Sequence, residues 1–444
     1  MNSQAKALDN DSCDKAIRAS FLHFVGDPDE LADACEYIED GLLILKAGRV
    51  TALGEARDWL DFLPDGAELH DYSGKLVMPG FFDTHTHYPQ IDMIASYGAQ
   101  LLEWLEKYTF PTERQFGDRS FADGVADFFC DELLRNGTTT SAVFATIHPE
   151  SVDAIFCAAQ KRDMCLIAGK VMMDRNAPDY ICDTAESSYT QSAELIERWH
   201  RKGRSLYAVT PRFAPTSSEK QLEAAGHLLK QFPGLYLQSH VAENHAEVAW
   251  VAKLFPARRS YLDVYDHYGL LGERSIYGHC IHLDDIDRQR MAETGAAMAF
   301  CPTSNLFLGS GLFSIADARD KGIRVGVATD VGGGTSFSML QTLNEAYKVS
   351  QMAGQTLTSM KAFYLATLGG AKALYLDAQL GNFAVGKEAD FVVLDLAATP
   401  IMQRRMAQAD SISDQLFALM MLGDDRAVHA AHVKGRRQYL VEQK

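Results

Sequence analysis

The strongest constraint on the fold is a regular alternation of short apolar runs of β type with longer segments of helical periodicity. Eight such runs follow one another: Leu76–His87, Thr138–Phe144, Leu166–Met172, Leu206–Pro211, Leu235–His240, Ser275–His279, Ala297–Pro302 and Val325–Asp330. Helical patterns separate most of them: Arg119–Asn136, Ser187–Lys202, Ser218–Gln231, Glu243–Leu254 and Asp284–Gly295. Strands that alternate with helices form parallel sheets, and eight units predict an α/β fold with a closed (β/α)₈ TIM barrel. An open, doubly wound sheet is the alternative.

The two ends of the chain carry hairpin patterns of their own. Leu42–Leu45 and Arg49–Leu53 flank the turn sequence Lys46-Ala47-Gly48. Near the other end, Phe391–Leu394 is a short apolar strand, and a second hairpin turns at Gly435. We therefore expect a small composite β-sandwich domain built from the N- and C-terminal segments. The predicted division is residues 1–78 and 379–444 for the β domain, the second part with room for a helical tail, and 79–378 for the barrel.

Composition and charge narrow the class of protein. Hydrophobic residues make up 47% of the chain and charged residues 23%, which excludes a largely disordered, collagen-like or membrane protein. The net charge of −17 argues against a nucleic-acid or anionic-membrane partner. The N-terminus lacks the pattern of a secretory signal. The eight cysteines are scattered, as is typical of reduced thiols, so we expect a cytoplasmic protein.

Several of the predicted strands end in residue types that bind metals. In a (β/α)₈ barrel, catalytic residues lie at the C-terminal ends of the strands. The first run ends at His85 and His87, whose spacing by two places both side chains on one face of the strand. Three other runs end at His240, His279 and Asp330. Imidazole nitrogen and carboxylate oxygen suit zinc and also iron, so the sequence predicts a metal site where these ends meet.

A carboxylate follows one of these ends. Glu243 lies three residues after His240, which makes it the natural general acid or base beside the metal. Its other interpretation is a solvated carboxylate at a helix start. A cation held at the strand ends would lower the pKa of a water molecule toward about 7. His279 either ligates the metal or hydrogen-bonds the activated water, and the residues alone leave both readings open.

The segment Pro79–His87 resembles the strand-1 signature of the amidohydrolase superfamily. His240, His279 and Asp330 match the later metal-site positions of that superfamily, and Gly386–Leu394 resembles its return to the β domain. The resemblance covers nearly the whole chain and implies a metal-dependent hydrolase.

Binuclear members of the superfamily carry a bridging lysine at the end of the fourth strand. Here that run ends Val209–Arg212 without a lysine, and Lys170 in the third run is taken as structural. One metal ion per chain is therefore expected.

A narrower resemblance, to the guanine deaminase family, rests on longer motifs: His87–Gln90, Leu101–Leu105, Thr109–Glu113, Pro211–Pro215, Cys301–Asn305 and Asp330–Thr335. This resemblance implies hydrolytic deamination of guanine to xanthine and ammonia, one Zn²⁺ per chain with Fe²⁺ as the alternative, and a homodimer. It also implies that the metal is held by His85, His87, His240 and Asp330. The catalytic residues that it implies are Glu243, His279 and Asp330. The substrate-binding residues that it implies are His87, Gln90, Arg212, Phe213, His240, His279 and Asp330.

The side chains assigned to the purine have suitable chemistry. Gln90 offers a donor and an acceptor at one amide, Arg212 offers a fork of donors, and Phe213 offers a face for stacking. Without the family, Arg212 is equally well read as a surface residue and Phe213 as a core residue. The segments Tyr97–Phe110 and Leu306–Leu312 are candidates for covering the substrate.

The expected mechanism begins with attack of a zinc-activated hydroxide on the ring carbon that bears the amine. Glu243 protonates the adjacent ring nitrogen, Asp330 accepts the proton of the hydroxide, and His279 orients the tetrahedral species. One alternative is a deaminase of a related heterocycle, such as a pterin, cytosine or a triazine. The other is a catalytically inactive scaffold on the same fold, which should have lost metal ligands.

Overall fold

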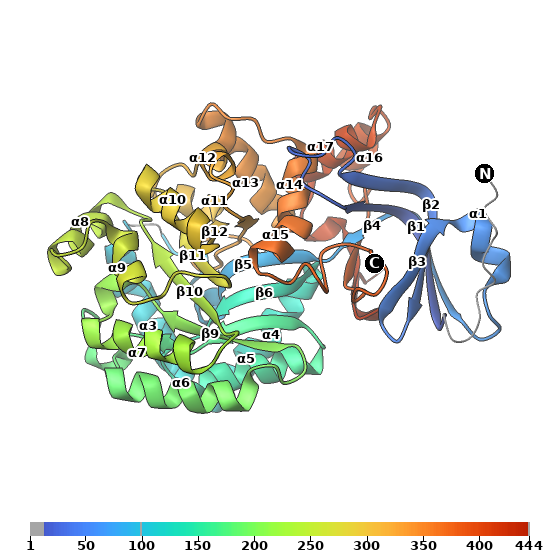
Figure 1. The fold of residues 1–444 in the computed structure, drawn as a ribbon. Helices are drawn as coiled ribbons and strands as arrows, with labels where there is room; N and C mark the ends of the chain where they lie inside the picture. Colours follow the sequence, from blue (N-terminus) through green and yellow to red (C-terminus); the bar gives the residue numbers. More distant parts are fainter. Residues whose placement is uncertain (1–12, 98–99, 443–444) are drawn as a thin grey trace.

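The protein, seen in a computed structural model that describes residues 13–97 and 100–442, contains a barrel and a separate sheet (Figure 1). Eight strands form the barrel in the order β5-β6-β7-β9-β10-β11-β12-β13, each parallel to the next, and β8 pairs with β9. Their bounds are β5 (Phe81–His87), β6 (Thr138–Phe144), β7 (Cys165–Gly169), β8 (Val171–Met172), β9 (Ser205–Pro211), β10 (Tyr236–Val241), β11 (Ser275–His279), β12 (Ala297–Phe300) and β13 (Val325–Val327). The predicted (β/α)₈ barrel is confirmed.

In the described chain, the first and last barrel strands, β5 and β13, are not paired by a backbone ladder. Individual hydrogen bonds join them instead. Thr84 Oγ1 donates to the Val327 carbonyl at 3.0 Å. Just beyond β13, the Thr329 amide donates to Asp83 Oδ1 at 3.0 Å, and the Asp330 amide donates to the His85 carbonyl at 2.9 Å. This seam therefore ties one predicted metal-site residue to another.

Helices cover the outside of the barrel (Figure 1). Those of ten residues or more are α4 (Arg119–Arg135), α5 (Pro149–Lys161), α6 (Ala185–Trp199), α7 (Glu219–Gln231), α8 (His245–Leu254), α10 (Asp285–Thr294), α13 (Met339–Met352) and α17 (Ile412–Leu422). The shorter helices of the described chain are α1 (Ala56–Trp59), α2 (Leu101–Trp104), α3 (Phe110–Glu113), α9 (Tyr261–His267), α11 (Pro302–Phe307), α12 (Ile315–Asp320), α14 (Ser359–Ala366), α15 (Leu368–Ala373) and α16 (Pro400–Met406). Of these, α1 lies beside the strands of the N-terminal segment and not on the barrel (Figure 1). Side-chain caps such as Asp118 on α4 and Ser218 on α7 bond the first amide groups, which explains where these helices begin.

Both ends of the chain meet in one seven-stranded sheet beside the barrel (Figure 1), of order β16-β15-β14-β4-β1-β2-β3. Its strands are β1 (Lys15–Phe24), β2 (Cys35–Lys46), β3 (Arg49–Glu55), β4 (Glu68–Pro79), β14 (Phe391–Leu394), β15 (Val428–Val433) and β16 (Arg436–Leu440). Both predicted hairpins are antiparallel pairs within it. Leu43 of β2, Phe391 of β14 and Ala430 of β15 share one hydrophobic cluster, so strands from both ends of the chain contribute to one small core on this sheet.

Two of the predicted runs are not single strands. The run Leu76–His87 crosses from the composite sheet into the barrel at Gly80, between β4 and β5. A Cβ atom on Gly80 would lie 2.1 Å from Thr139 Oγ1, so only glycine allows this crossing. The run Leu166–Met172 is interrupted at Lys170, whose buried side chain pairs with Asp183. An apolar pattern does not register such breaks, because the residues on both sides are buried.

The core has separate layers. One cluster between the barrel and its helices includes Phe129, Phe156 and Val349, and a second, inside the barrel, includes the small residues Ala142 and Ala299. In the described part of the chain, no helix is both long and apolar enough to cross a bilayer.

Candidate active site

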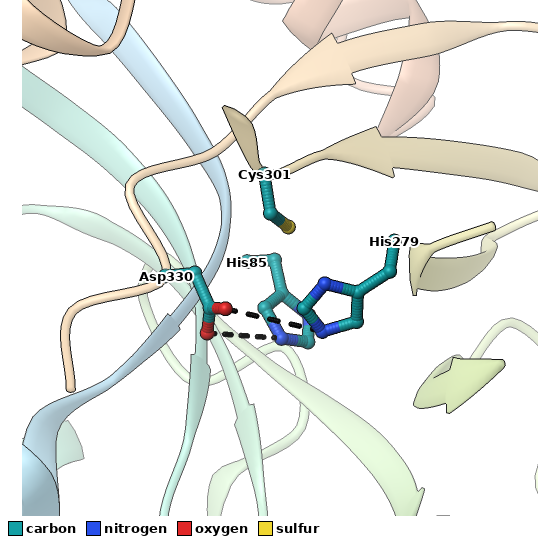
Figure 2. Close-up of side chains that lie close together, drawn as sticks. All are labelled: His85, His279, Cys301 and Asp330. Carbon is teal, nitrogen blue, oxygen red and sulfur yellow. Dashed lines mark ion pairs between the residues drawn. The ribbon is translucent and has the colours of Figure 1, made fainter. Parts of the chain in front are cut away.

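All five predicted metal-site residues lie at or just after the C-terminal ends of barrel strands. His85 and His87 belong to β5, His240 to β10 and His279 to β11, and Asp330 follows β13. Figure 2 shows the side chains of His85, His279 and Asp330 converging from two strands and from the loop after β13. The carboxyl ends of parallel strands share one rim of a barrel, and this places residues from distant parts of the chain together.

Three imidazole nitrogens and one carboxylate oxygen form a compact group of electron-pair donors. Nε2 of His87 lies 3.3 Å from Nε2 of His85 and 3.2 Å from Nε2 of His240. Oδ1 of Asp330 lies 3.3 Å from Nε2 of His87 and 3.5 Å from Nε2 of His85. The side chain of His240 is partly buried, and the other three are buried. These four donors are thus arranged around a single point.

The protonation states suit metal binding. Burial lowers the pKa of His87 to about 3 and holds the pKa of His240 well below its usual value. Burial also raises the pKa of Asp330, but hydrogen bonds to His85 and His87 outweigh this effect and leave that pKa well below its usual range. Neutral imidazoles and an ionised carboxylate are the forms that bind a cation.

Two of the histidines are oriented through their second ring nitrogen. His240 Nδ1 donates to the Arg212 carbonyl at 2.7 Å, and His279 Nδ1 donates to Asn305 Oδ1 at 2.9 Å. Because Nδ1 carries the hydrogen, the lone pair of each Nε2 faces the cluster. Hydrogen-bond partners of this kind fix the ring tautomer at metal sites.

The backbone is strained at the same strand ends. His279, Asp330 and Ala242 have φ values of +70°, +50° and +50°, a region that side chains other than glycine rarely adopt. Each such residue costs about 1 kcal/mol or more and persists only where its surroundings hold it. Backbone strain of this kind is therefore present at the predicted site.

Glu243 lies in the loop after β10, ahead of the cap of α8. Its Oε1 accepts a hydrogen bond from Ser310 Oγ at 2.9 Å, and its Oε2 lies 3.3 Å from His279 Nε2. The side chain is buried, so it is not a solvated carboxylate at a helix start. Burial, followed by the charge of Asp330, raises the pKa of Glu243 to about 8, which leaves the carboxyl protonated at neutral pH.

A cavity opens beside this cluster and is lined by the three residues predicted to bind a ring, Gln90, Arg212 and Phe213. All three are buried, so the surface interpretation of Arg212 is wrong. Both segments proposed as covers contribute to the wall, the first through Trp104 and the second through Leu308. Within the first segment, residues 98 and 99 lie outside the described residues.

Sequence reasoning missed five buried residues around the cavity, which are Glu113, Glu247, Cys301, Asn305 and Ser310. Glu113 bonds both Gln90 and Arg212. Cys301 lies beside the cluster in Figure 2, with the pKa of its thiol raised well above the usual value by burial. Glu113, Cys301 and Asn305 belong to motifs that carry the family resemblance, but the sequence indicates no role for them. No sequence pattern points to Glu247 or Ser310.

Glu247 holds the loop that carries Glu243. Its carboxylate accepts hydrogen bonds from the backbone amides of Glu243 and Asn244, at 2.9 and 3.2 Å, and from the Tyr261 hydroxyl at 2.7 Å. Burial raises the pKa of Glu247 to about 7. This residue therefore fixes the backbone from which the candidate acid extends.

Comparison with known proteins places this geometry in a family. The model of the amidohydrolase family matches residues 76–437. The chain is 54% identical to guanine deaminase of Escherichia coli over 428 residues, 96% of this chain and 98% of that protein. It is 35% identical to guanine deaminase of Homo sapiens over 428 residues, 90% of this chain and 92% of that protein.

Solved structures agree with the sequence comparisons. The crystal structure of guanine deaminase from Bradyrhizobium japonicum is 38% identical, with a TM-score of 0.91 over 96% of this chain and 99% of that chain. The C. acetobutylicum enzyme, solved with bound guanine in its active site, is 27% identical, with a TM-score of 0.85 over 96% of this chain and 100% of that chain. On its sequence, its fold and these comparisons, the chain belongs to the amidohydrolase family and, within it, to the guanine deaminases.

Proposed function

We propose that this protein hydrolyses guanine to xanthine and ammonia at a site that holds one zinc ion. The observation that carries the proposal is the group of four donors, His85, His87, His240 and Asp330, beside the buried carboxyl of Glu243 at one cavity. Family membership supports the same reaction, since the relatives named above are guanine deaminases.

The donor set fits a small first-row cation. Zinc would bind nitrogen and oxygen ligands at about 2.0–2.2 Å, so neighbouring ligand atoms must lie within about 4 Å of one another. The separations among the donors of His85, His87, His240 and Asp330 run from 3.2 to 3.5 Å where they are bonded or paired. We assign these four residues as ligands, with iron as the alternative metal. His279 Nε2 lies 3.9 Å from Asp330 Oδ2 and closer to Glu243, so we assign His279 to hydrogen bonding.

The cavity suits a flat, neutral base. Phe213 offers a face for stacking, while Gln90 and Arg212 offer polar groups. Leu101, Leu105 and other apolar residues complete the wall, which excludes water from the reacting atoms.

When bound, zinc supplies Lewis acidity that lowers the pKa of water and prepares it for attack. Asp330 accepts a proton from the attacking water as its oxygen bonds to the ring carbon that carries the amine. Glu243, protonated at neutral pH, donates to the adjacent ring nitrogen. His279 hydrogen-bonds the new oxygen. A proton returned through Glu243 or Asp330 then lets the amine leave as ammonia. The ring carbon that carried the amine forms a double bond to the added oxygen.

Ammonia release tests the proposal directly. Purified protein of measured metal content would be given guanine, adenine, cytosine and a pterin in parallel. We expect release from guanine alone, with about one zinc per chain. A metal-loaded protein that releases no ammonia from guanine, or releases more from another ring, would overturn it.

The homodimer is a proposal drawn from the family resemblance, and the cytoplasmic location is a proposal drawn from the eight scattered, free cysteines. Light scattering during size-exclusion chromatography tests the first, with a mass of twice 49.1 kDa expected. Fractionation of the producing cells tests the second.

A further inference from the structure

We propose that Glu113 is a positioning residue that makes the pocket selective for a lactam edge, by presenting Gln90 as an acceptor and Arg212 as a donor. The proposal rests on the proposed function and extends it to the part of the purine that is recognised. Glu113 itself is not among the residues that line the cavity and acts through these two neighbours.

Glu113 is a fully buried carboxylate at the end of α3. Its Oε1 accepts from Gln90 Nε2 at 3.0 Å, and both of its oxygens accept from Arg212 Nη1, at 2.9 and 2.8 Å. Phe110, on the same helix, lies under the guanidinium, 5.8 Å from ring centre to Cζ. A buried carboxylate is stable only with such partners, so these contacts are strongly specified.

The bond from Glu113 fixes the orientation of the Gln90 amide. A carboxylate can only accept, so the NH₂ group of Gln90 must face Glu113 and the carbonyl oxygen must face away. That oxygen lies against Gly332, where an added Cβ would approach it to 2.1 Å. Among the residues that the structure describes, the side chain of Gln90 is bonded through Nε2, and no donor to its oxygen is found. Gln90 is thus presented to the cavity as an acceptor.

Arg212 is presented in the complementary sense. Its Nη1 is occupied by Glu113, while Nε and Nη2 have no acceptor within the described ranges 13–97 and 100–442. The backbone of Arg212 is held between the Met172 carbonyl, bonded at 3.2 Å, and the His240 ring, bonded at 2.7 Å. The free donors therefore stand at a defined place relative to the metal ligands.

An acceptor beside a donor is the complement of a lactam. Guanine carries N1–H and the C6 carbonyl on neighbouring ring atoms, whereas adenine and 2,6-diaminopurine carry a bare N1 and a C6 amine. With the amide held by Glu113, a 6-amino purine would place donor against donor and acceptor against acceptor. Sites that leave buried polar groups unpaired with the wrong ligand reject it strongly. Glu113 also neutralises Arg212, which favours a neutral base over an anion.

The first test uses the unmodified protein. Hypoxanthine has the lactam edge of guanine but no 2-amino group, and adenine has the reversed edge. We expect hypoxanthine to compete with guanine about tenfold or more better than adenine does. Equal inhibition by the two would overturn the assignment of the edge, even if guanine turnover itself is normal.

The second test compares guanine with 2,6-diaminopurine, which keeps the reacting 2-amino group. In Glu113→Gln the neutral amide no longer dictates how Gln90 points, so we expect the ratio of kcat/KM for the two purines to fall about tenfold or more, mainly through KM. Asp183→Asn, which breaks the buried pair with Lys170 away from the cavity, is the matched control and should leave the ratio unchanged.

A double-mutant cycle separates positioning from loss of packing. If Glu113 acts through Gln90, the effects of Glu113→Gln and Gln90→Ala on the ratio are not additive, because the second change removes the group that the first releases. An unchanged ratio in a folded, zinc-loaded Glu113→Gln variant, or full additivity, would overturn the proposal. Failure of the wild-type protein to deaminate guanine would instead overturn the proposed function.

Discussion

Ser310 Oγ donates a 2.9 Å hydrogen bond to Oε1 of Glu243, across 67 residues of sequence. Ser310 is itself anchored at both backbone atoms. Its amide donates to the Asn305 carbonyl at 2.8 Å, and its carbonyl accepts from His282 Nε2 at 2.9 Å. The candidate acid is therefore held by a hydroxyl that belongs to one of the two segments predicted to cover the substrate.

Removing this hydroxyl should lower turnover without emptying the metal site. We expect kcat of Ser310→Ala to fall about tenfold, since a hydrogen bond to a catalytic group is worth about 1.4 kcal/mol. Steady-state ammonia release measures the change. Ser350→Ala, which deletes a buried hydroxyl bonded within α13, is the control and should keep full kcat. A normal kcat in Ser310→Ala would show that the bond does not matter for catalysis.

Glu243→Gln tests the acid itself. The amide keeps the size of the side chain but cannot transfer a proton, so we expect kcat to fall by roughly 10²-fold or more with normal zinc content. Metal analysis and single-turnover assays on the same preparation measure both quantities. Near-full activity would refute the assignment, and loss of zinc would mean that Glu243 belongs to the metal site.

Asp83 holds the residue before Asp330, one of the proposed metal ligands. Its carboxylate accepts from the Thr329 amide at 3.0 Å and from the Thr329 hydroxyl, directly before Asp330. We expect Asp83→Asn to weaken zinc binding about 10–100-fold, the usual effect of losing a group that orients a ligand. Competition with a chelator measures the affinity. The control is Asp287→Asn, which changes a buried carboxylate in a network at α10 and should leave the zinc affinity unchanged. Equal zinc affinities in the two variants would contradict the prediction.

The composite sheet contains an acid-sensitive histidine. His432 is buried, bonded through Nε2 to the Tyr72 hydroxyl at 2.9 Å and stacked on Phe391 at 4.3 Å. Burial, then the nearby His70, lowers the pKa of His432 to about 3. A folded-state pKa below the unfolded value means that stability is fully present above about pH 6.5 and is lost as the pH falls toward 3.

In His432→Phe this titration is absent, although loss of the Tyr72 bond costs about 1 kcal/mol at neutral pH. We therefore expect the thermal midpoint of the wild type to fall more steeply than that of the variant between pH 7 and pH 4.5. Release of metal by acid affects both proteins, so the difference between their slopes is the quantity to measure. Parallel curves would rule out His432 as the source.

The sequence predicted most residues of the candidate site but few of the residues that position them. His85, His87, His240 and Asp330 were recognisable because each ends an apolar run, and the period of two places the first pair on one face. The crossing at Gly80 was missed, since burial on both sides erases the pattern. The division into residues 1–78, 79–378 and 379–444 stays a prediction.

The sequence by itself determined that eight parallel strands would share one rim and that residues of metal-binding types would gather there, because strand direction and side-chain alternation are local properties. Tertiary structure alone decided which side chains hydrogen-bond the residues of the site and fix their orientation. Glu113 meets Arg212 across 99 residues, and Asn305 meets His279 across 26. Such pairs depend on loop paths and side-chain rotamers that only the packed molecule settles.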